Sequence, residues 1–286
     1  MSAALFAQGL AIGLVNGVLY VLTALGLTLV YGILHIVNFA HGEIFMLGAM
    51  ALYFLYVVYK LPLALTLIAI VILAMLAGFA VERGLFRKLR GQWLQLLVAS
   101  VGLSLIIQSI SWIVFGAQEK TIPTIVPGVL QFAGIRMPFE RLAAAGVGLV
   151  LVAGLYWLVF RTKLGLAMRA IEEDEETARM LGVDSNRVAA LAVGLGFLLA
   201  ALGGVFTAPI YSLNPGMGLE AIVISFIIII IGGLGSITGT VLAGLLIGVL
   251  QSLGAIAFGA EAAYALVFIV MILVLVLRPS GLLGRV

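Results

Sequence analysis

Few side chains in this sequence have types that could carry acid–base or binding chemistry, and three of them fall in one short polar segment. Asn38, His41 and Glu43 lie within Tyr31–Glu43, which separates two long apolar runs. A carboxylate at the edge of an apolar run either serves the function of a membrane protein or starts a helix favourably through the helix dipole. Both interpretations of Glu43 stay open.

Patterns typical of catalysis or metal binding are missing. The chain has no cysteine and two histidines, His35 and His41, whose spacing does not place both on one helix face. None of the lysines follows a glycine as in a nucleotide-binding loop, and no Ser-His-acid arrangement is recognisable. We therefore expect no catalytic residue, no metal site and no cofactor bound by this chain.

A glycine-rich segment, Gly232–Thr240, interrupts the apolar pattern again in the second half of the chain. Interrupted spans at corresponding places in two halves point to the substrate path of a transporter, while close helix packing around glycine is the alternative. The path hypothesis selects Asn38, His41, Glu43, Gly232, Gly233, Gly235, Ser236 and Thr238.

The elements that position these residues must lie in a membrane. Of 286 residues, 64% are hydrophobic and 9% charged, and the mean hydropathy is +1.30. Soluble domains carry roughly 25% charged residues, so a soluble enzyme, a disordered chain and a nucleic-acid binder are excluded. Continuous apolar runs favour helices over a membrane barrel, whose strands alternate in polarity.

The runs predict an all-α, polytopic helical bundle of about 8–10 spans, including broken or half-membrane helices. Residues 1–286 form one transmembrane domain. Leu219–Ile231 is the shortest run, about 20 Å long against a hydrocarbon core of roughly 30 Å. The candidate spans are Leu5–Val30, Ile44–Tyr59, Leu63–Val81, Leu94–Phe115, Leu142–Phe160, Val188–Tyr211, Leu219–Ile231, Val241–Ala257 and Ala262–Leu277.

Basic residues set the expected orientation. Eleven of the 15 Lys and Arg residues fall in Glu82–Trp93, in the loop 161–187 and in the C-terminal tail. Span parity puts these three regions on one side, which the positive-inside rule makes cytoplasmic. The loop 116–141 and the N-terminus are then expected outside, and the C-terminus inside.

The loop 161–187 contains a run of five acidic residues flanked by Arg169 and Arg179. Ala167, Ala170, Ile171, Ala178 and Leu181 repeat at helical spacing, and Gly182 suits a helix end. We predict a short amphipathic helix outside the bilayer that binds a protein partner, since an acidic face suits an anionic membrane surface poorly. A solvated linker helix is the alternative.

Three segments resemble signatures of the branched-chain amino-acid ABC transporter permeases. Asn38–Gly48 resembles the first signature, Ala170–Gly182 is similar to the cytoplasmic coupling loop, and Gly232–Gly239 resembles the C-terminal glycine signature. Their order and spacing match over nearly the whole chain, and its length and start resemble the H-type subunit. Thr238 stands where many relatives carry proline.

The resemblance implies an importer of leucine, isoleucine or valine in the bacterial inner membrane. Its implied partners are a second permease (an M-type subunit or a second copy), two cytoplasmic ATPase subunits that use the ATP, and a periplasmic binding protein. Glu43 could orient an ammonium group. The implied ATPase-coupling residues are Ala170, Glu172, Glu173, Asp174, Glu175, Glu176, Ala178, Arg179, Leu181 and Gly182.

Other functions stay open. Relatives that carry urea or short-chain amides share similar motifs, so the solute is less firmly implied than the class of permease, and urea, short-chain amides or other amino acids are the alternative solutes. An ion-driven secondary transporter is a rival interpretation, and the lack of mid-span carboxylates argues against it. A scaffold or channel subunit is a second rival, against which the paired glycine-rich breaks argue.

Overall fold

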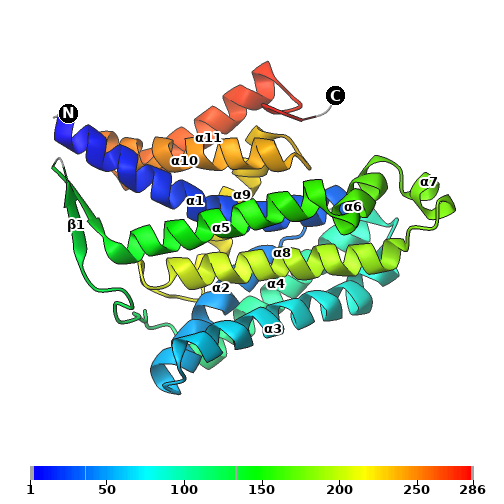
Figure 1. Cartoon of the computed structure of the whole chain (residues 1–286), viewed down its shortest axis with the longest axis horizontal. Coiled ribbons are helices and arrows are strands. Elements are labelled where there is room, and N and C mark those ends of the chain that lie inside the picture. Colours follow the sequence, from blue (N-terminus) through cyan, green and yellow to red (C-terminus); the bar gives the residue numbers. More distant parts are fainter. Residues whose placement is uncertain (1–2, 36, 133, 285–286) are drawn as a thin grey trace.

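The computed structural model describes residues 3–35, 37–132 and 134–284. Long helices lie side by side in a bundle, and a two-stranded hairpin stands at one end (Figure 1). In chain order the elements are α1 (Ala3–Leu34), α2 (His41–Leu52), η1 (Tyr53–Val58), α3 (Leu63–Val81), η2 (Glu82–Phe86), η3 (Arg87–Leu89), α4 (Trp93–Phe115), β1 (Val129–Phe132), β2 (Ile135–Pro138), α5 (Phe139–Arg161), α6 (Lys163–Glu173), α7 (Glu175–Met180), α8 (Ser185–Thr207), α9 (Met217–Gly232), α10 (Ile237–Phe258) and α11 (Ala260–Leu277).

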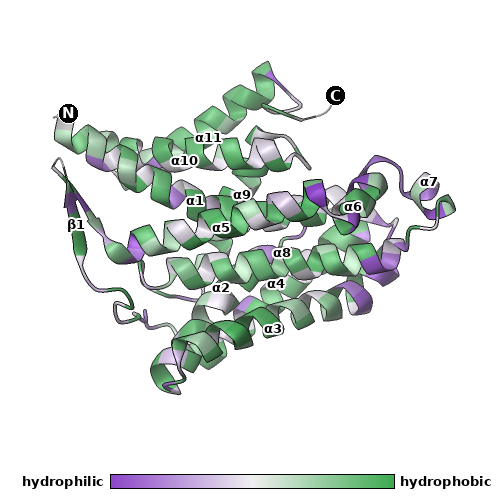
Figure 2. Ribbon diagram, viewed as in Figure 1, coloured by the Kyte–Doolittle hydropathy of each residue, from purple (hydrophilic) through white to green (hydrophobic). Residues whose placement is uncertain are grey.

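The membrane-spanning bundle predicted from the sequence is confirmed. Within the described ranges, eight helices are long and apolar enough to cross a membrane, and α9 is a shorter apolar helix. Hydrophobic residues make up most of the length of these helices (Figure 2). Each predicted apolar run falls on a helix, although α8 ends at Thr207 rather than Tyr211. Pro209 explains the earlier end, because proline cannot continue a helix.

Small residues let the central helices approach closely. A Cβ added to Gly26 of α1 would lie 2.5 Å from the Gly196 carbonyl oxygen of α8, and a Cβ on Gly196 would lie 2.7 Å from the Gly26 oxygen. This is the small-residue packing that associates helices in membranes. As a result α1 and α8 form the centre, and 83% of the α8 span is buried against 11% of the α4 span.

The two ends of the bundle differ in charge. α6, α7 and the C-terminal ends of α3 and α5 lie together at one end of the bundle, where many residues are hydrophilic (Figure 2). We call this the basic end, because the clusters at 83–90, 161–187 and Arg278 lie there; Arg285 lies outside the described residues. The N-terminus lies at the opposite end (Figure 1), as span parity predicts.

The all-α expectation needs one addition, in the loop 116–141. β1 and β2 form an antiparallel hairpin with Val129 opposite Pro138 and Phe132 opposite Ile135. Lys120 exchanges backbone hydrogen bonds of 2.9 and 2.8 Å with Leu213. The loop is thereby attached to the segment between α8 and α9.

The single amphipathic helix predicted in the loop 161–187 is wrong, because two helices occupy it. Asp174 is extended (φ −159°) between α6 and α7, and its Oδ1 accepts hydrogen bonds from the backbone N–H groups of Glu176 (2.9 Å) and Thr177 (3.2 Å). An aspartate that caps a new helix competes with the helical path, which explains the break. Leu181 is 80% exposed instead of lying on a buried stripe with Ile171 and Ala178.

Candidate functional site

The segment after α1 turns back into the bundle. His35 has a left-handed backbone conformation (φ 53°), and His41 Nε2 lies 3.0 Å from the carbonyl oxygen of Thr23 on α1. At roughly 1.5 Å per residue, Thr23 lies about 16 Å inside the end of α1. The helix α2 therefore begins inside the protein, as the prediction of broken helices requires.

Asn38 forms the turn that starts α2. Its Oδ1 accepts a hydrogen bond from the Ala40 backbone N–H at 3.1 Å, and the His41 N–H donates to the Asn38 carbonyl at 3.3 Å. Asparagine favours such turns because its side chain replaces a backbone acceptor. Asn38 and His41 are fully buried, and Glu43 is 2% exposed.

Glu43 lies where three helices meet. Ser104 of α4 donates a hydrogen bond to Glu43 Oε1 at 3.1 Å, and a Cβ added to Gly218 of α9 would lie 2.8 Å from Oε2. Among the described residues, Asn38 Nδ2, His41 Nδ1 and Glu43 Oε2 are buried without a hydrogen-bond partner. Three such atoms from one motif call for a functional explanation, because buried polar groups are normally satisfied.

Two serines of α4 hold this segment, and the sequence analysis did not select them. Besides Ser104, Ser100 accepts a hydrogen bond from the Phe39 backbone N–H at 3.3 Å. Their spacing places both on one face of α4, which is the signal that could have identified them.

A second copy of the asparagine turn starts α9. Asn214 Oδ1 accepts a hydrogen bond from the Gly216 N–H at 2.8 Å, and the Met217 N–H donates to the Asn214 carbonyl at 3.2 Å. The sequence Asn-x-x-x-Gly occurs in both turns, as Asn38–Gly42 and Asn214–Gly218. This repeat was the sequence signal that the analysis missed.

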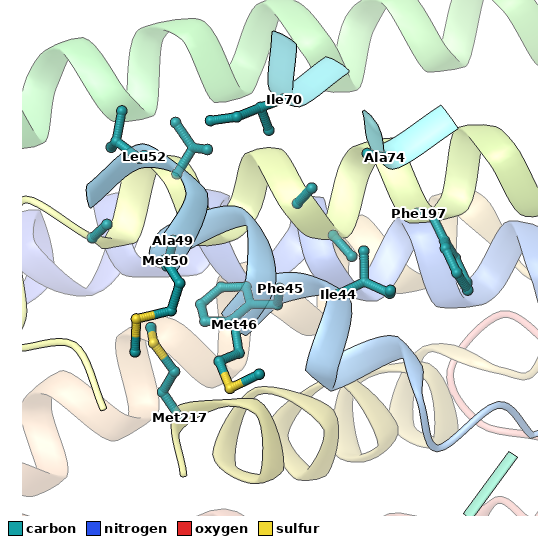
Figure 3. Packing of buried hydrophobic residues seen from close by; sticks show 14 of the residues in the cluster. Ile44, Phe45, Met46, Ala49, Met50, Leu52, Ile70, Ala74, Phe197 and Met217 are labelled. Carbon is teal, nitrogen blue, oxygen red and sulfur yellow. The ribbon is translucent and has the colours of Figure 1, made fainter. Parts of the chain in front are cut away.

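The two turns face each other. A Cβ on Gly42 would collide with the Gly218 carbonyl oxygen, and a Cβ on Gly218 would lie 2.9 Å from the Gly42 oxygen. Met217 of α9 lies against Met46 and Met50 of α2 in one buried cluster (Figure 3). The first turns of α2 and α9 are therefore packed together inside the bundle.

The correspondence predicted between the segments at 31–43 and 232–240 is wrong. The counterpart of the first break is the loop 208–216, which leads from α8 into α9 just as 35–40 leads from α1 into α2. The glycine-rich segment follows α9 and matches the turn between η1 and α3. Neither the glycine-rich segment nor the turn between η1 and α3 contains an asparagine turn. The apolar pattern shows only where a span is interrupted, so by itself it could not indicate which two interruptions correspond.

The glycine-rich segment lies at the basic end, apart from Asn38, His41 and Glu43. Ser236 Oγ caps α10 by accepting a hydrogen bond from the Gly239 N–H at 3.1 Å. Backbone N–H groups of Leu282 and Leu283 in the C-terminal tail donate to the carbonyls of Ile231 and Gly232 at 2.7 and 3.1 Å. Gly233 and Gly235 both have positive φ, so this turn requires glycine.

A cavity of about 410 Å³ at the basic end joins two groups of sequence-predicted residues. Its lining includes Glu172 and Glu173 from α6 and Gly235, Ser236 and Thr238 from the turn into α10. A Cβ on Gly235 would lie 2.9 Å from Glu172 Oε1, and a Cβ on Gly32 of α1 would lie 3.5 Å from the same carboxyl group. Glu172 thus sits between the end of α1 and the end of α9.

Comparison with known proteins gives a consistent result. Residues 9–277 match the family described as "Branched-chain amino acid transport system / permease component". The chain belongs to this family. It is 35% identical to the high-affinity branched-chain amino acid transport permease BraD of Pseudomonas aeruginosa, over 98% of this chain and 96% of the relative. It is 31% identical to LivH of Salmonella typhimurium over 98% of this chain and 96% of that relative.

More distant likeness extends to another import system. The autoinducer 2 import permease LsrC of Escherichia coli is 29% identical over 64% of this chain and 53% of its own length. No solved structure matches this permease. The family inferred from three motifs and the H-type resemblance inferred from length and the start of the chain are confirmed, and as the permease component of an ABC transport system the chain is not an enzyme.

The α6–α7 segment of the permease presents an exposed surface at the basic end. Leu166, Met180 and Leu181 are 61%, 78% and 80% exposed. Glu173 and Glu176 are also exposed, whereas Ala178 is buried and Gly182 has a φ of 88° at the end of α7. Hydrogen bonds from the Thr177 side chain and backbone, and from the Glu176 backbone, hold the pKa of Asp174 below its usual range.

An ion-pair network attaches α7 to the spanning helices. Glu175 lies 2.6 Å from Arg179 and 3.6 Å from Arg90, and Arg90 in turn lies 2.9 Å from Glu82. Glu82 is completely buried and also pairs with Arg87 at 2.7 Å. The segment Glu82–Trp93, predicted as a loop, therefore begins with a buried carboxylate in η2.

Proposed function

We propose that this permease imports branched-chain amino acids through the inner membrane of a bacterium. The observation that carries the proposal is the meeting of two half-helices, α2 and α9, at facing asparagine turns inside a bundle of this family. Half-helices that begin inside the membrane are typical of transporter binding sites, because their free N–H groups can face a polar solute. The relatives BraD and LivH are named for branched-chain amino acid transport, which supports the solute.

We place the basic end in the cytoplasm, which puts the C-terminus inside and the hairpin end in the periplasm. The α6–α7 surface would then contact one of two ATPase subunits, and a periplasmic binding protein would deliver the solute at the hairpin end. The path residues would be Asn38, His41 and Glu43 at the interior turns, with Gly232, Gly233, Gly235, Ser236 and Thr238 at the cytoplasmic exit. A second permease subunit completes the transporter.

Glu172 and the Glu175 network give the coupling role a physical route. Movement of α6 would act through Glu172 on the ends of α1 and α9, while movement of α7 would act through Glu175 and Arg90 on α3. The joint at Asp174 lets the two helices respond separately. ATP stays with the partner subunits, and this chain supplies the surface on which they act.

The test is reconstitution with the ATPases, the second permease and the binding protein in liposomes. Labelled leucine should accumulate with ATP, and urea should not. The variant Glu173→Lys/Glu176→Lys reverses two exposed charges while sparing the Asp174 cap and the Glu175 ion pair. We expect it to lose ATPase binding and uptake, whereas Glu119→Lys, an exposed charge reversal in the loop 116–141, should keep both.

Two results would overturn parts of the proposal. Urea uptake without leucine uptake would refute the solute. Full ATPase binding and uptake by Glu173→Lys/Glu176→Lys would refute the coupling surface.

A further inference from the structure

A carboxylate lies exposed in the first turn of α9, within the part of the bundle that spans the membrane. Glu220 is exposed, and Leu219 beside it is 59% exposed. Gly218, two residues earlier, packs against Gly42 inside the bundle, so this turn lies away from both ends of the bundle. A carboxylate facing lipid there would be costly, and such groups normally face water or a polar partner.

Polar side chains from α1, α10 and α11 form a cluster beside α9. The Tyr20 hydroxyl of α1 donates a hydrogen bond to Gln251 Oε1 of α10 at 2.7 Å. The Gln251 side chain also bonds to Tyr264 of α11. Tyr20 packs against the buried cluster that contains Ile222 and Ile224 of α9, which follow Glu220 in the same helix. Tyr264 is 37% exposed, so the cluster opens to the surface.

The cluster continues toward the hairpin end with a positive charge. The Tyr211 hydroxyl donates to Asn16 Oδ1 at 3.2 Å, and Arg141 Nη1 donates to the same oxygen at 3.5 Å. The Arg141 guanidinium lies 5.5 Å from the centre of the Tyr211 ring. Asn16 and Tyr20 are four residues apart on α1 and share one face of that helix, so Arg141 lies on the same face as the Tyr20–Gln251 pair.

We propose that this face, formed by α1, α9, α10 and α11, lines the water-filled path on the hairpin side of the interior turns. Glu220 would meet the ammonium group of the passing amino acid, and Arg141 its carboxylate. A carboxylate and a guanidinium on one polar face match the two opposite charges of a zwitterion. The inference rests on the proposed import of amino acids, and it assigns the solute contacts to residues outside the three family-like motifs.

The first test uses the lack of native cysteine in the chain. Single variants Glu220→Cys and Tyr264→Cys are treated in the assembled transporter with a cationic, membrane-impermeant methanethiosulfonate. Ile272→Cys on α11, at a position that is 57% exposed on an apolar stretch, is the matched control. We expect both path variants to react at least tenfold faster than the control.

Two labelling results would overturn the proposal. Reaction as slow as that of Ile272→Cys would mean that lipid covers this face. Fast reaction in the isolated permease but not in the assembled transporter would mean that the second permease covers it.

The second test measures transport. At a saturating concentration of leucine-loaded binding protein, Glu220→Gln and Arg141→Gln should each lower leucine uptake at least tenfold at an unchanged rate of ATP hydrolysis. Glu220→Asp should recover part of the uptake, and Glu119→Gln should match the unchanged permease. Full uptake by Glu220→Gln would refute the proposal.

The two tests separate this inference from the proposed function. If the unchanged transporter fails to import leucine, the proposed solute is wrong, while cysteine labelling still decides whether this face is aqueous. If leucine is imported but neither variant changes uptake and labelling is slow, the proposed function stands and the inference fails.

Discussion

The turns that begin α2 and α9 share their backbone and differ in their surroundings. In each, an asparagine oxygen accepts a hydrogen bond from the N–H two residues later, at 3.1 Å for Asn38 and 2.8 Å for Asn214. In each, the following glycine touches the other turn. The carboxylates that follow the two turns nevertheless have different surroundings. Glu43 is buried against Ser104 of α4, while Glu220 is exposed beside α1, α10 and α11.

The two packed turns thus form a structural core, whereas the exposed Glu220 belongs to a surface that can change its contacts. Facing turns with small residues hold the two half-helices together, and close packing makes that joint sensitive to any added atom. One acidic residue then faces inward and one faces outward, because Glu220 lies one position further from its glycine than Glu43 does. The two turns therefore share a backbone conformation, but their acidic side chains point into different environments.

The largest effect is expected from filling the contact between the turns. Gly42→Ala should lower stability by about 3 kcal/mol or more, since its Cβ would meet the Gly218 backbone, while Gly218→Ala should cost about 1–3 kcal/mol. Thermal unfolding in detergent measures both. Gly154→Ala on α5, where a Cβ meets nothing within 4 Å, is the control and should be neutral or slightly stabilising. Equal tolerance of all three changes would contradict the close joint.

The next largest effect is the difference in stability expected between variants of Glu43 and Glu220. Glu43→Ala should cost about 1–3 kcal/mol of stability, because it removes the acceptor of Ser104 and leaves a buried gap. Glu220→Ala should change stability by less than about 0.5 kcal/mol, as an exposed residue does. Unfolding of Glu43→Ala, Ser104→Ala and the double variant gives their coupling energy. A Glu220→Ala protein as unstable as Glu43→Ala would contradict the proposed difference between the two carboxylates.

Variants of Asn38 and Asn214 test whether both turns depend on the asparagine side chain. Asn38→Ala and Asn214→Ala each remove one turn hydrogen bond and should each cost roughly 0.5–2 kcal/mol. Asn214→Asp keeps the acceptor oxygen and should recover most of that loss. Chemical or thermal unfolding curves decide the result, and a neutral Asn214→Ala would show that the second turn does not need its side chain.

The smallest effect is expected at Lys60, which is compared with Gly235 at the end of the other helix. Lys60 follows η1 with a φ of 54°, and Gly235 follows α9 with a φ of 81°. Lys60→Gly should change stability by less than about 1 kcal/mol, because relief of the left-handed strain is offset by the entropy of glycine in the unfolded chain. Gly235→Ala should cost about 1–2 kcal/mol. Unfolding midpoints measure both variants, and a midpoint of Lys60→Gly as low as that of Gly235→Ala would contradict this prediction.

Several features followed from the sequence alone. Long apolar runs can exist only as spanning helices in lipid, so the membrane class, the approximate number of spans and the concentration of basic residues at one end were predictable. The motif around Asn38 marked the right segment for the same reason: polar residues within an apolar pattern need a special position. Three motifs in matching order and spacing indicated the permease family from the sequence alone.

Tertiary structure decided which distant segments meet. Nothing local shows that Gly42 faces Gly218, that Ser104 bonds to Glu43, or that Glu172 reaches Gly235, because side-chain contacts across helices depend on how the helices cross. The break at Asp174 also lay beyond the apolar pattern, since helical and capping geometries compete there by small free energies. Composition and periodicity thus determined that the chain forms membrane helices, and only packing determined which of their polar side chains share a site.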